Sequence, residues 1–268
     1  MCSKKKLQFC KIFFKKYYTI FVAMNDVWFK EWFNSPYYHK LYAHRDEQEA
    51  ANFINNLINF LKPTLGSKML DLGCGKGRHS MHLSNMGFDV TGIDLSSESI
   101  CEALLLQNHF LHFYEHDMRI PFWINYFDVV FNFFTSFGYF NTQREHDQAI
   151  KNVVTSLKPG GTFVLDYLNV QFSTQNQVLD TSQHIGSSHY QITKWNDEHH
   201  FYKKIIVTDK NLSRPMQYTE KVAKFSLKNF VDMFGKQKLS IIKILGSYNL
   251  EDYNEQHSPR LIIIAKKP

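Results

Sequence analysis

The feature that most constrains this 268-residue chain is a glycine-rich turn directly after an apolar run. Residues 69–72 are mostly apolar, Gly73, Gly75 and Gly77 follow, and a polar segment begins at Arg78. Glycine adopts positive φ values and lets the backbone approach a ligand closely. At the end of a parallel strand, a turn of this kind forms a nucleotide site. The sequence therefore predicts a parallel α/β fold with a nucleoside site beside this turn.

Strand and helix signals alternate along the first 170 residues. The spacing of apolar residues over 46–62 predicts an amphipathic helix that ends before Pro63 and Gly66. After it we expect strands over 69–72, 89–95, 112–116, 128–133 and 162–168, and helices over 78–85, from Ser96 or Ser97 to about 109, and from Thr142 to 157. A turn at 158–161 should end the last of these helices. Alternation of this kind indicates a parallel sheet with helices on both faces.

The pattern changes after residue 170. Runs rich in β-forming residues over 190–195, 201–208 and 218–225 have no long helix between them, so we expect an antiparallel cap inserted within 170–225. This cap is the expected lid that shapes an acceptor site. Ser226 should cap a short helix over 227–234 that Gly235 closes. Strands over 239–245 and 261–265 follow, and the second is apolar on both faces, which predicts a position inside the sheet.

The spacing of acidic residues and glycines distinguishes between cofactors. Asp94 closes the second strand 21 residues after Gly73, where an acid can accept hydrogen bonds from both ribose hydroxyls. Arg78 stands where the dinucleotide fingerprint requires its third glycine. Asp71 lies in the first strand, where it could face an ammonium group. These features favour S-adenosylmethionine, which has an ammonium group and no phosphate, over a dinucleotide.

Five motifs follow one another between residues 70 and 168: LDLGCGKGRH, VTGIDLS, HDM, FDVVFNFFTSFGYF and LKPGGTFVLDYLN. In these motifs the chain resembles the class I S-adenosylmethionine-dependent methyltransferases, and in detail the small-molecule methyltransferases that carry an antiparallel cap after the fifth strand. The resemblance implies a Rossmann-like, doubly wound α/β fold. Its seven-stranded sheet is mostly parallel, and its last strand inserts antiparallel between the fifth and sixth strands.

The resemblance also implies which residues hold S-adenosylmethionine. Gly73 and Gly75 would back the methionine moiety, and Asp94 would bind the ribose. Leu95 would pack on the adenine, whose amino group would donate to Asp117 beside Met118. The fourth strand ends in Asn132-Phe133-Phe134 and lacks the N-P-P-[YF] sequence of nucleobase amino-methyltransferases. A small-molecule methyl acceptor is therefore expected.

No catalytic triad is visible, which suits an in-line methyl transfer that depends mainly on alignment of donor and acceptor. Tyr139, Tyr167 and His79 are candidate acceptor contacts, since each is expected at a strand end or helix start near the crevice. Core packing would explain either tyrosine, and capping or surface exposure would explain His79. Two alternatives stay open at this point: an NAD(P)-dependent oxidoreductase and a non-catalytic S-adenosylmethionine-binding protein.

Aromatic residues are concentrated before the first predicted domain helix. Trp32, Tyr37, Tyr38 and Tyr42 lie there. In the methyltransferases that this chain resembles, such segments fold over the cofactor. Amphipathic packing would explain these residues nearly as well.

Histidine and cysteine spacings give no metal site. His109, His112 and His116 straddle a predicted helix end and strand without the spacing of metal ligands. The four cysteines show no paired spacing, so we expect neither a disulfide scaffold nor a zinc cluster, and a cytoplasmic, reducing location.

The net charge of +6 is confined to the first 23 residues, which contain six lysines and no acid. Residues 24–268 are therefore formally neutral, which disfavours nucleic acid as a partner. The basic, partly apolar segment 1–23 could be a signal peptide, a membrane anchor or sequence upstream of a start at Met24. It is too short and too interrupted by lysine for stable membrane insertion. We therefore divide the chain into this leader and a domain over 24–268.

Overall fold

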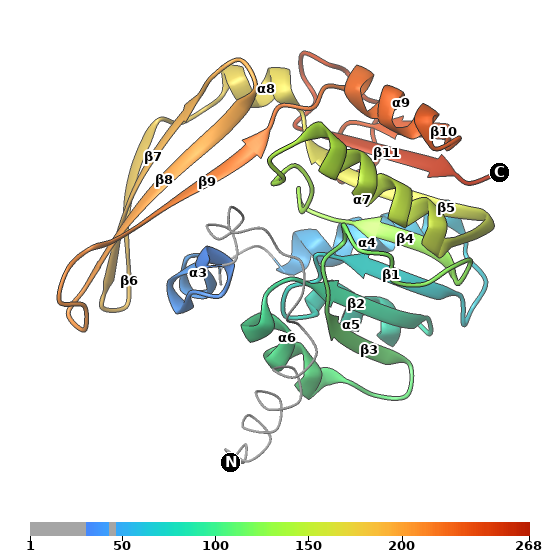
Figure 1. Ribbon diagram of the computed structural model, residues 1–268, viewed down its shortest axis with the longest axis horizontal. Helices are drawn as coiled ribbons and strands as arrows, with labels where there is room; N and C mark the ends of the chain where they lie inside the picture. Colours follow the sequence, from blue (N-terminus) through green and yellow to red (C-terminus); the bar gives the residue numbers. More distant parts are fainter. Residues whose placement is uncertain (1–30, 43–46) are drawn as a thin grey trace.

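The computed structural model describes residues 31–42 and 47–268. The leader over 1–23 and the alternative start at Met24 lie outside the described residues. Figure 1 shows a large sheet with helices on both faces and, beside it, a second sheet that stands apart as an arm. In the part of the chain that is described, no helix combines the length and apolar character required to span a bilayer.

The large sheet has seven strands in the order β10-β11-β5-β4-β1-β2-β3. Only β11 pairs antiparallel, with β5 on one side and β10 on the other. The strands are β1 (Lys68–Leu72), β2 (Asp89–Asp94), β3 (Leu111–Glu115), β4 (Phe127–Asn132), β5 (Leu157–Leu168), β10 (Ser240–Leu245) and β11 (Arg260–Lys266). The predicted fold class is thereby confirmed, including the buried position of the last strand, whose five central residues are at most 1% exposed.

Helices cover the two faces of this sheet with separate apolar cores. On one face lie α4 (Glu47–Leu61), α5 (Arg78–Asn85) and α6 (Ser97–Ala103), which a 3₁₀ turn η1 (Leu104–Leu106) extends. On the other face lie α7 (Gln143–Ser156) and α9 (Leu227–Lys236), whose Ile150 and Phe230 are fully buried. Burial of both faces of a parallel sheet explains why its strands read as nearly continuous apolar runs.

The second sheet is the inserted antiparallel cap. It has the order β6-β7-β8-β9, with β6 (Asp180–Ile185), β7 (Ser188–Asn196), β8 (His200–Asp209) and β9 (Met216–Ala223), and α8 (Val170–Gln175) leads into it. The short helix α3 (Pro36–Leu41) packs on this sheet, where Trp32 and Leu41 share a core with Tyr190 and Ile205. Figure 1 shows α3 between the cap and the large sheet.

The predicted helix starts are confirmed by their caps. Ser96 and Ser226 cap α6 and α9 through their side chains, and Thr142 and Glu145 form the predicted capping box of α7. These caps satisfy N–H groups that have no partner within the helix.

Helix ends were harder to predict than helix starts. The helix expected to reach about residue 109 stops at Ala103, and η1 follows. Beyond η1 the chain turns, and Asn108 Oδ1 accepts from Phe110 N–H at 2.8 Å. Gly235 was expected to close α9 and does not. The helix continues to Lys236, and Lys238 takes the left-handed conformation at φ 59°.

Two features of the strands also differ from prediction. The cap has a fourth strand, β6, which the sequence did not indicate because its residues are polar and mostly exposed. The expected turn at 158–161 lies within the bounds of β5. It appears there as a register shift, since Leu157 pairs with Phe127 but Thr162 pairs with Val129.

Candidate active site

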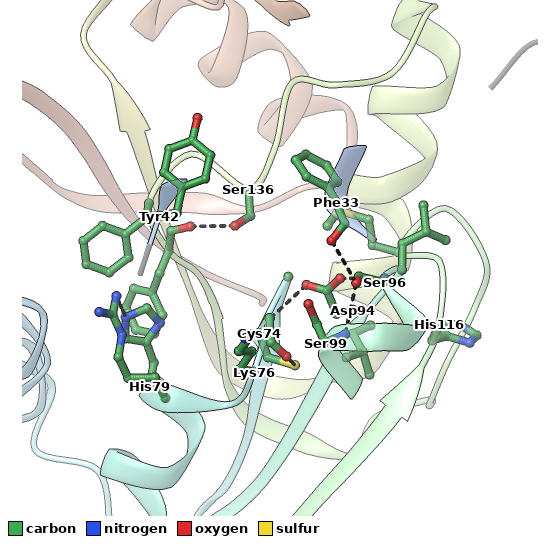
Figure 2. A pocket seen from close by; sticks show the side chains of 18 of the residues that line it. Phe33, Tyr42, Cys74, Lys76, His79, Asp94, Ser96, Ser99, His116 and Ser136 are labelled. Carbon is green, nitrogen blue, oxygen red and sulfur yellow. Dashed lines mark hydrogen bonds between the residues drawn. The ribbon is translucent and has the colours of Figure 1, made fainter. Parts of the chain in front are cut away.

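A cavity of about 590 Å³ opens at the carboxyl ends of β1, β2 and β4. Ligands of open α/β sheets bind at this edge, and the volume lies within the range of roughly 300–1,000 Å³ that is usual for small-molecule sites. Of the residues predicted to bind the cofactor, six line it: Gly73, Gly75, Asp94, Leu95, Asp117 and Met118. Figure 2 shows Asp94 close to Cys74 in the wall of this cavity.

The glycine turn joins β1 to α5 and needs glycine for two reasons. Gly73 and Gly75 have φ values of +77° and +55°, where other residues are strained. A Cβ on Gly73 would also lie 2.7 Å from the Cβ of Ser136, in the loop after β4. The N–H groups of Gly73 and Cys74 donate to the Ile93 carbonyl at 2.8 and 3.0 Å. The turn is therefore fixed between two neighbouring strands.

Asp94 lies at the end of β2, in the cavity wall. Its Oδ2 accepts from Gly75 N–H at 2.9 Å and its Oδ1 from Ser96 N–H at 2.8 Å. Burial raises the pKa of Asp94, although these backbone N–H groups act in the opposite direction. Each carboxylate oxygen can accept more than one hydrogen bond, so Asp94 can receive donors from the cavity as well.

Asp71 is the seventh predicted cofactor residue, and it does not line the cavity. It is 1% exposed, and its Oδ2 accepts from Ser80 Oγ at 2.7 Å, while Oδ1 accepts no hydrogen bond from the described residues. Burial raises its pKa to about 7. Asp71 is therefore not exposed to the cavity, where the predicted direct contact with an ammonium group would take place. It packs behind the glycine turn instead.

Asp117 and Met118 form the wall at the end of β3, together with His116, which the sequence analysis did not select. The Asp117 carboxylate accepts from Arg119 Nε at 3.1 Å and from Arg119 Nη2 at 2.7 Å. Arg119 also donates to Glu145, the capping-box residue of α7, at 2.5 Å. Asp117 Oδ1 also accepts from the backbone N–H of Arg119 at 2.8 Å, so this network fixes Asp117 at the expected adenine corner.

The three acceptor-contact candidates separate into two groups. His79 and Tyr139 line the cavity, and Figure 2 shows His79 at its edge. Tyr167 is fully buried, and its hydroxyl donates to the Ala223 carbonyl at 2.6 Å. The prediction for Tyr167 was wrong, because the loop around Gly138 crosses its hydroxyl and separates it from the cavity: a Cβ on Gly138 would lie 2.3 Å from that oxygen.

The backbone after β4 forms the part of the cavity wall next to the glycine turn. Phe134 and Thr135 line the cavity and have φ values of 53° and 62°, in the left-handed region. That conformation costs a residue with a side chain roughly 1–2 kcal/mol, and it is unusual for a β-branched one. The ring of Phe134 stacks on His79, with centroids 4.9 Å apart and planes at 17°.

The aromatic segment around α3 closes the cavity from the cap side. Phe33, Tyr38 and Tyr42 line the cavity, whereas Trp32 is buried against the cap. Packing therefore explains Trp32, whereas the cover over a cofactor that was expected of this segment stays a prediction for Tyr38 and Tyr42. The strands of the cap do not line the cavity among the described residues, so the expectation that they shape it directly was wrong. The cap instead contacts the residues on either side of α3. Glu220 of β9 accepts from Trp32 Nε1 at 2.7 Å and from Tyr42 Oη at 2.6 Å.

Within residues 31–42 and 47–268 there is no group of three or more histidine, cysteine or acidic side chains that could hold a metal ion.

Comparison with known proteins identifies the class of domain that this site belongs to. Residues 70–165 match the family described as methyltransferase domain. A methyltransferase of Bacillus subtilis (strain 168) is 36% identical over 102 residues, which cover 37% of this chain and 41% of that protein. The dTDP-3-amino-3,4,6-trideoxy-alpha-D-glucopyranose N,N-dimethyltransferase of Streptomyces venezuelae is 31% identical over 123 residues, 46% of this chain and 51% of that protein. The chain thus spans about half or less of the length of these relatives.

Structural comparison shows a similarity that covers more of the chain than residues 70–165. The crystal structure of an S-adenosylmethionine-dependent methyltransferase from Clostridium acetobutylicum ATCC 824 superimposes with a TM-score of 0.72 at 18% identity, covering 86% of this chain and 96% of that one. Residues 70–165 therefore match a methyltransferase domain, and the fold of the chain is that of the class I S-adenosylmethionine-dependent methyltransferases.

Proposed function

We propose that this protein transfers the methyl group of S-adenosylmethionine to a small-molecule acceptor. The observation that carries the proposal is the position of Asp94, whose carboxylate lines the cavity while it accepts from Gly75 N–H. A carboxylate fixed at this point can receive the two hydroxyls of a ribose. The turn beside it has Arg78 in place of the third glycine that a pyrophosphate site needs, which disfavours an NAD(P)-dependent oxidoreductase.

The residues of the cavity fit S-adenosylmethionine at each of its parts. Gly73 and Gly75 offer a close backbone approach for the methionine moiety, and Asp94 can bind the ribose. Leu95 and Met118 supply apolar surface for the adenine, whose amino group can donate to Asp117. The sulfonium supplies an activated methyl group. The chain itself then has to align an acceptor with that methyl group and exclude water, which can contribute roughly 7–11 kcal/mol to the lowering of a barrier.

The acceptor side of the cavity is formed by His79, Phe134, Tyr139 and the α3 segment. Aromatic faces beside two polar side chains suit a small polar molecule with a flat or ring-shaped body. His79 and Tyr139 are the residues that we propose to orient the acceptor, through their polar atoms and ring faces. The Streptomyces venezuelae relative is named for an amino sugar linked to dTDP, which supports an amine of this size as the acceptor class.

Three further points belong to the same proposal. The neutral charge of residues 24–268 supports a protein that does not act on nucleic acid. The cysteine pattern supports a cytoplasmic location. The division into a leader over 1–23 and a domain over 24–268, with a cap insertion over 170–225, is our proposed domain organisation.

The test begins with binding of S-adenosylhomocysteine and NAD to the full chain, measured by calorimetry. We expect S-adenosylhomocysteine to bind and NAD not to bind, and the opposite result would favour an oxidoreductase. Transfer of a tritiated methyl group is then measured to dTDP-linked amino sugars, to simple amines and to a small-metabolite extract. Cofactor binding without transfer to any of these acceptors would favour a non-catalytic binding protein.

A further inference from the structure

The loop after β4 holds two side-chain-bearing residues in the left-handed region, and both line the cavity. Phe134 and Thr135 have φ values of 53° and 62°. Strained backbone persists only where the surrounding structure determines it, and it is concentrated at functional sites. What fixes this loop is therefore informative about the site.

The loop is fixed by a carboxylate from the neighbouring strand. Asp166 of β5 is fully buried, and its Oδ2 accepts from Phe134 N–H at 2.7 Å. The main-chain carbonyl of Asp166 accepts from Thr135 N–H at 3.1 Å. One residue thus binds the N–H groups of both strained residues. These bonds are available only while the loop keeps its left-handed turn, so they stabilise that conformation selectively.

Asp166 is itself held by two side chains from the end of the chain. Arg260 of β11 donates to Asp166 Oδ1 through Nε at 2.8 Å and to Thr135 Oγ1 through Nη2 at 2.9 Å. Tyr248 Oη donates to Asp166 Oδ2 at 3.2 Å. Arg260 therefore contacts both the carboxylate and the loop, and it supplies the charge that a fully buried carboxylate requires.

The loop conformation in turn sets the acceptor side of the cavity. Phe134 presents its ring to His79, and the next residue but one, Ser136, lies against Gly73 of the cofactor turn. Neither Asp166 nor Arg260 lines the cavity. Their hydrogen bonds reach it only through Phe134 and Thr135.

We propose that Asp166 and Arg260 are positioning residues for methyl transfer: together they hold the Phe134–Thr135 backbone in its left-handed turn and so place the wall against which the acceptor binds. This inference rests on the proposed function. It predicts that loss of either side chain impairs the alignment of the acceptor while the cofactor half of the cavity, formed by β1 and β2, stays intact.

The test compares Asp166→Asn, Arg260→Met and Arg260→Lys with a control, Ile263→Ala. Ile263 is a buried residue of the same strand as Arg260, and it packs in the core beneath α7 and α9. Its truncation therefore destabilises β11 without removing a loop contact. Three quantities are measured on the full chain: the Kd of S-adenosylhomocysteine, the kcat and KM with dTDP-3-amino-3,4,6-trideoxy-α-D-glucopyranose as probe, and the φ angles of residues 134 and 135 in crystals with S-adenosylhomocysteine.

We expect Asp166→Asn and Arg260→Met to leave the Kd of S-adenosylhomocysteine within about threefold and to lower kcat/KM for the probe about 100-fold, the loss that roughly 1 Å of misplacement can cause. Arg260→Lys, which can keep one of the two contacts, should lie between these variants and the wild type. The left-handed φ angles should be lost in Asp166→Asn and kept in Ile263→Ala. Equal losses of cofactor affinity and turnover, or an equal loss of turnover in Ile263→Ala, would overturn the inference.

A second substitution tests the conformational role itself. Glycine adopts a φ of 62° without strain, so Thr135→Gly added to Asp166→Asn should raise turnover above that of Asp166→Asn alone, by about fivefold or more. No gain from the glycine would mean that Asp166 acts in another way. If the wild type does not methylate the probe, the choice of acceptor in the proposed function fails, and the φ angles and cofactor affinities of the same variants still decide this inference.

Discussion

The carboxylate of Asp94 accepts a hydrogen bond from the backbone N–H of Gly75 at 2.9 Å. This contact joins the end of β2 to the turn that follows β1, so the acid and the glycine turn form one unit at the edge of the sheet. Its consequence is that Asp94 has two roles, since it fixes the turn and also faces the cavity.

Asp94→Ala should therefore weaken binding of S-adenosylhomocysteine by about 1–3 kcal/mol, the usual effect of removing one partner of a buried hydrogen bond. Calorimetry on the folded variant measures this. Asp89→Ala is the matched control, because Asp89 begins the same strand and pairs with Lys68 at 2.8 Å, outside the cavity. If Asp94→Ala binds S-adenosylhomocysteine with unchanged affinity, Asp94 does not bind the ribose.

Gly73→Ala should lower both stability and cofactor affinity. The new Cβ would lie 2.7 Å from the Cβ of Ser136, at a φ of +77° that alanine adopts only with strain. Either the loop after β4 or the turn must move, and we expect a loss of about 1–3 kcal/mol in the free energy of unfolding. Gly160→Ala also has a positive φ but an open surrounding, so it separates the backbone effect from the steric one. Equal losses in both variants would show that the contact with Ser136 has no consequence.

The parts of this fold that the sequence predicts well are those in which the signal is local. The apolar run before Gly73 gives β1 and its turn, and Thr142 with Glu145 gives the start of α7, because strand burial and helix capping act within a few residues. Strand β6 lacks such a signal. It is polar and exposed, and it is a strand only because β7 pairs with it.

The parts of the site that the sequence did not predict depend on distant contacts. Asp166 and Arg260 are separated by 94 residues, and Trp32 and Glu220 by 188. Nothing near Phe134 or Thr135 indicates positive φ, since neither is glycine, asparagine or aspartate. Tyr167 was misassigned for a related reason: its position at a strand end was correct, but the loop at Gly138 that buries its hydroxyl is not visible in the local sequence.

Asp71 should make the protein less stable as pH rises from about 4 to about 7. Burial raises its pKa to about 7 in the folded state, from 3.8 in the unfolded chain. Between these values the folded state holds a proton that the unfolded state has released, so the free energy of unfolding falls as pH increases.

The substitution Asp71→Asn removes this titration. The stability of the variant relative to the wild type should thus rise between pH 4 and pH 8, by up to about 4 kcal/mol at 1.36 kcal/mol per pKa unit. Urea unfolding at the two pH values measures the difference. If the difference in stability between the variant and the wild type does not depend on pH, the pKa of Asp71 is not raised in the folded protein.

Glu220 should control how firmly α3 covers the cavity. Its carboxylate accepts from Trp32 Nε1 and Tyr42 Oη, and Tyr42 lines the cavity. Glu220→Gln keeps the shape but removes the charge that strengthens both bonds, each of which contributes about 1.5–3 kcal/mol with a charged partner. We expect S-adenosylhomocysteine to dissociate several-fold faster, as measured by stopped-flow fluorescence. Glu198→Gln, in the exposed turn between β7 and β8, is the control, and equal rates in both variants would contradict a role for Glu220.

His146 should make the protein sensitive to acid. It is 3% exposed on α7, packed edge-to-face against Phe137 and Phe225, and its Nδ1 lies 2.9 Å from the Thr142 carbonyl. Since the carbonyl can only accept, Nδ1 carries the proton. The buried Nε2, which makes no hydrogen bond with the described residues, is unprotonated. Burial lowers the pKa of His146 to about 4, from 6.5. The contribution of His146 to stability is therefore complete above pH 6.5 and is lost as pH falls toward 4.

The substitution His146→Gln keeps a donor for Thr142 and removes the titration. From pH 7.5 to pH 5.0 the wild type should lose about 2 kcal/mol more than this variant, which corresponds to the 1.5 pH units below 6.5. Urea unfolding at both pH values gives the difference, and His199→Gln, in the exposed turn of the cap, should lose as much as the wild type. If His146→Gln also loses as much as the wild type, His146 already binds a proton in the folded state, and its Nε2 must then have a partner in solution.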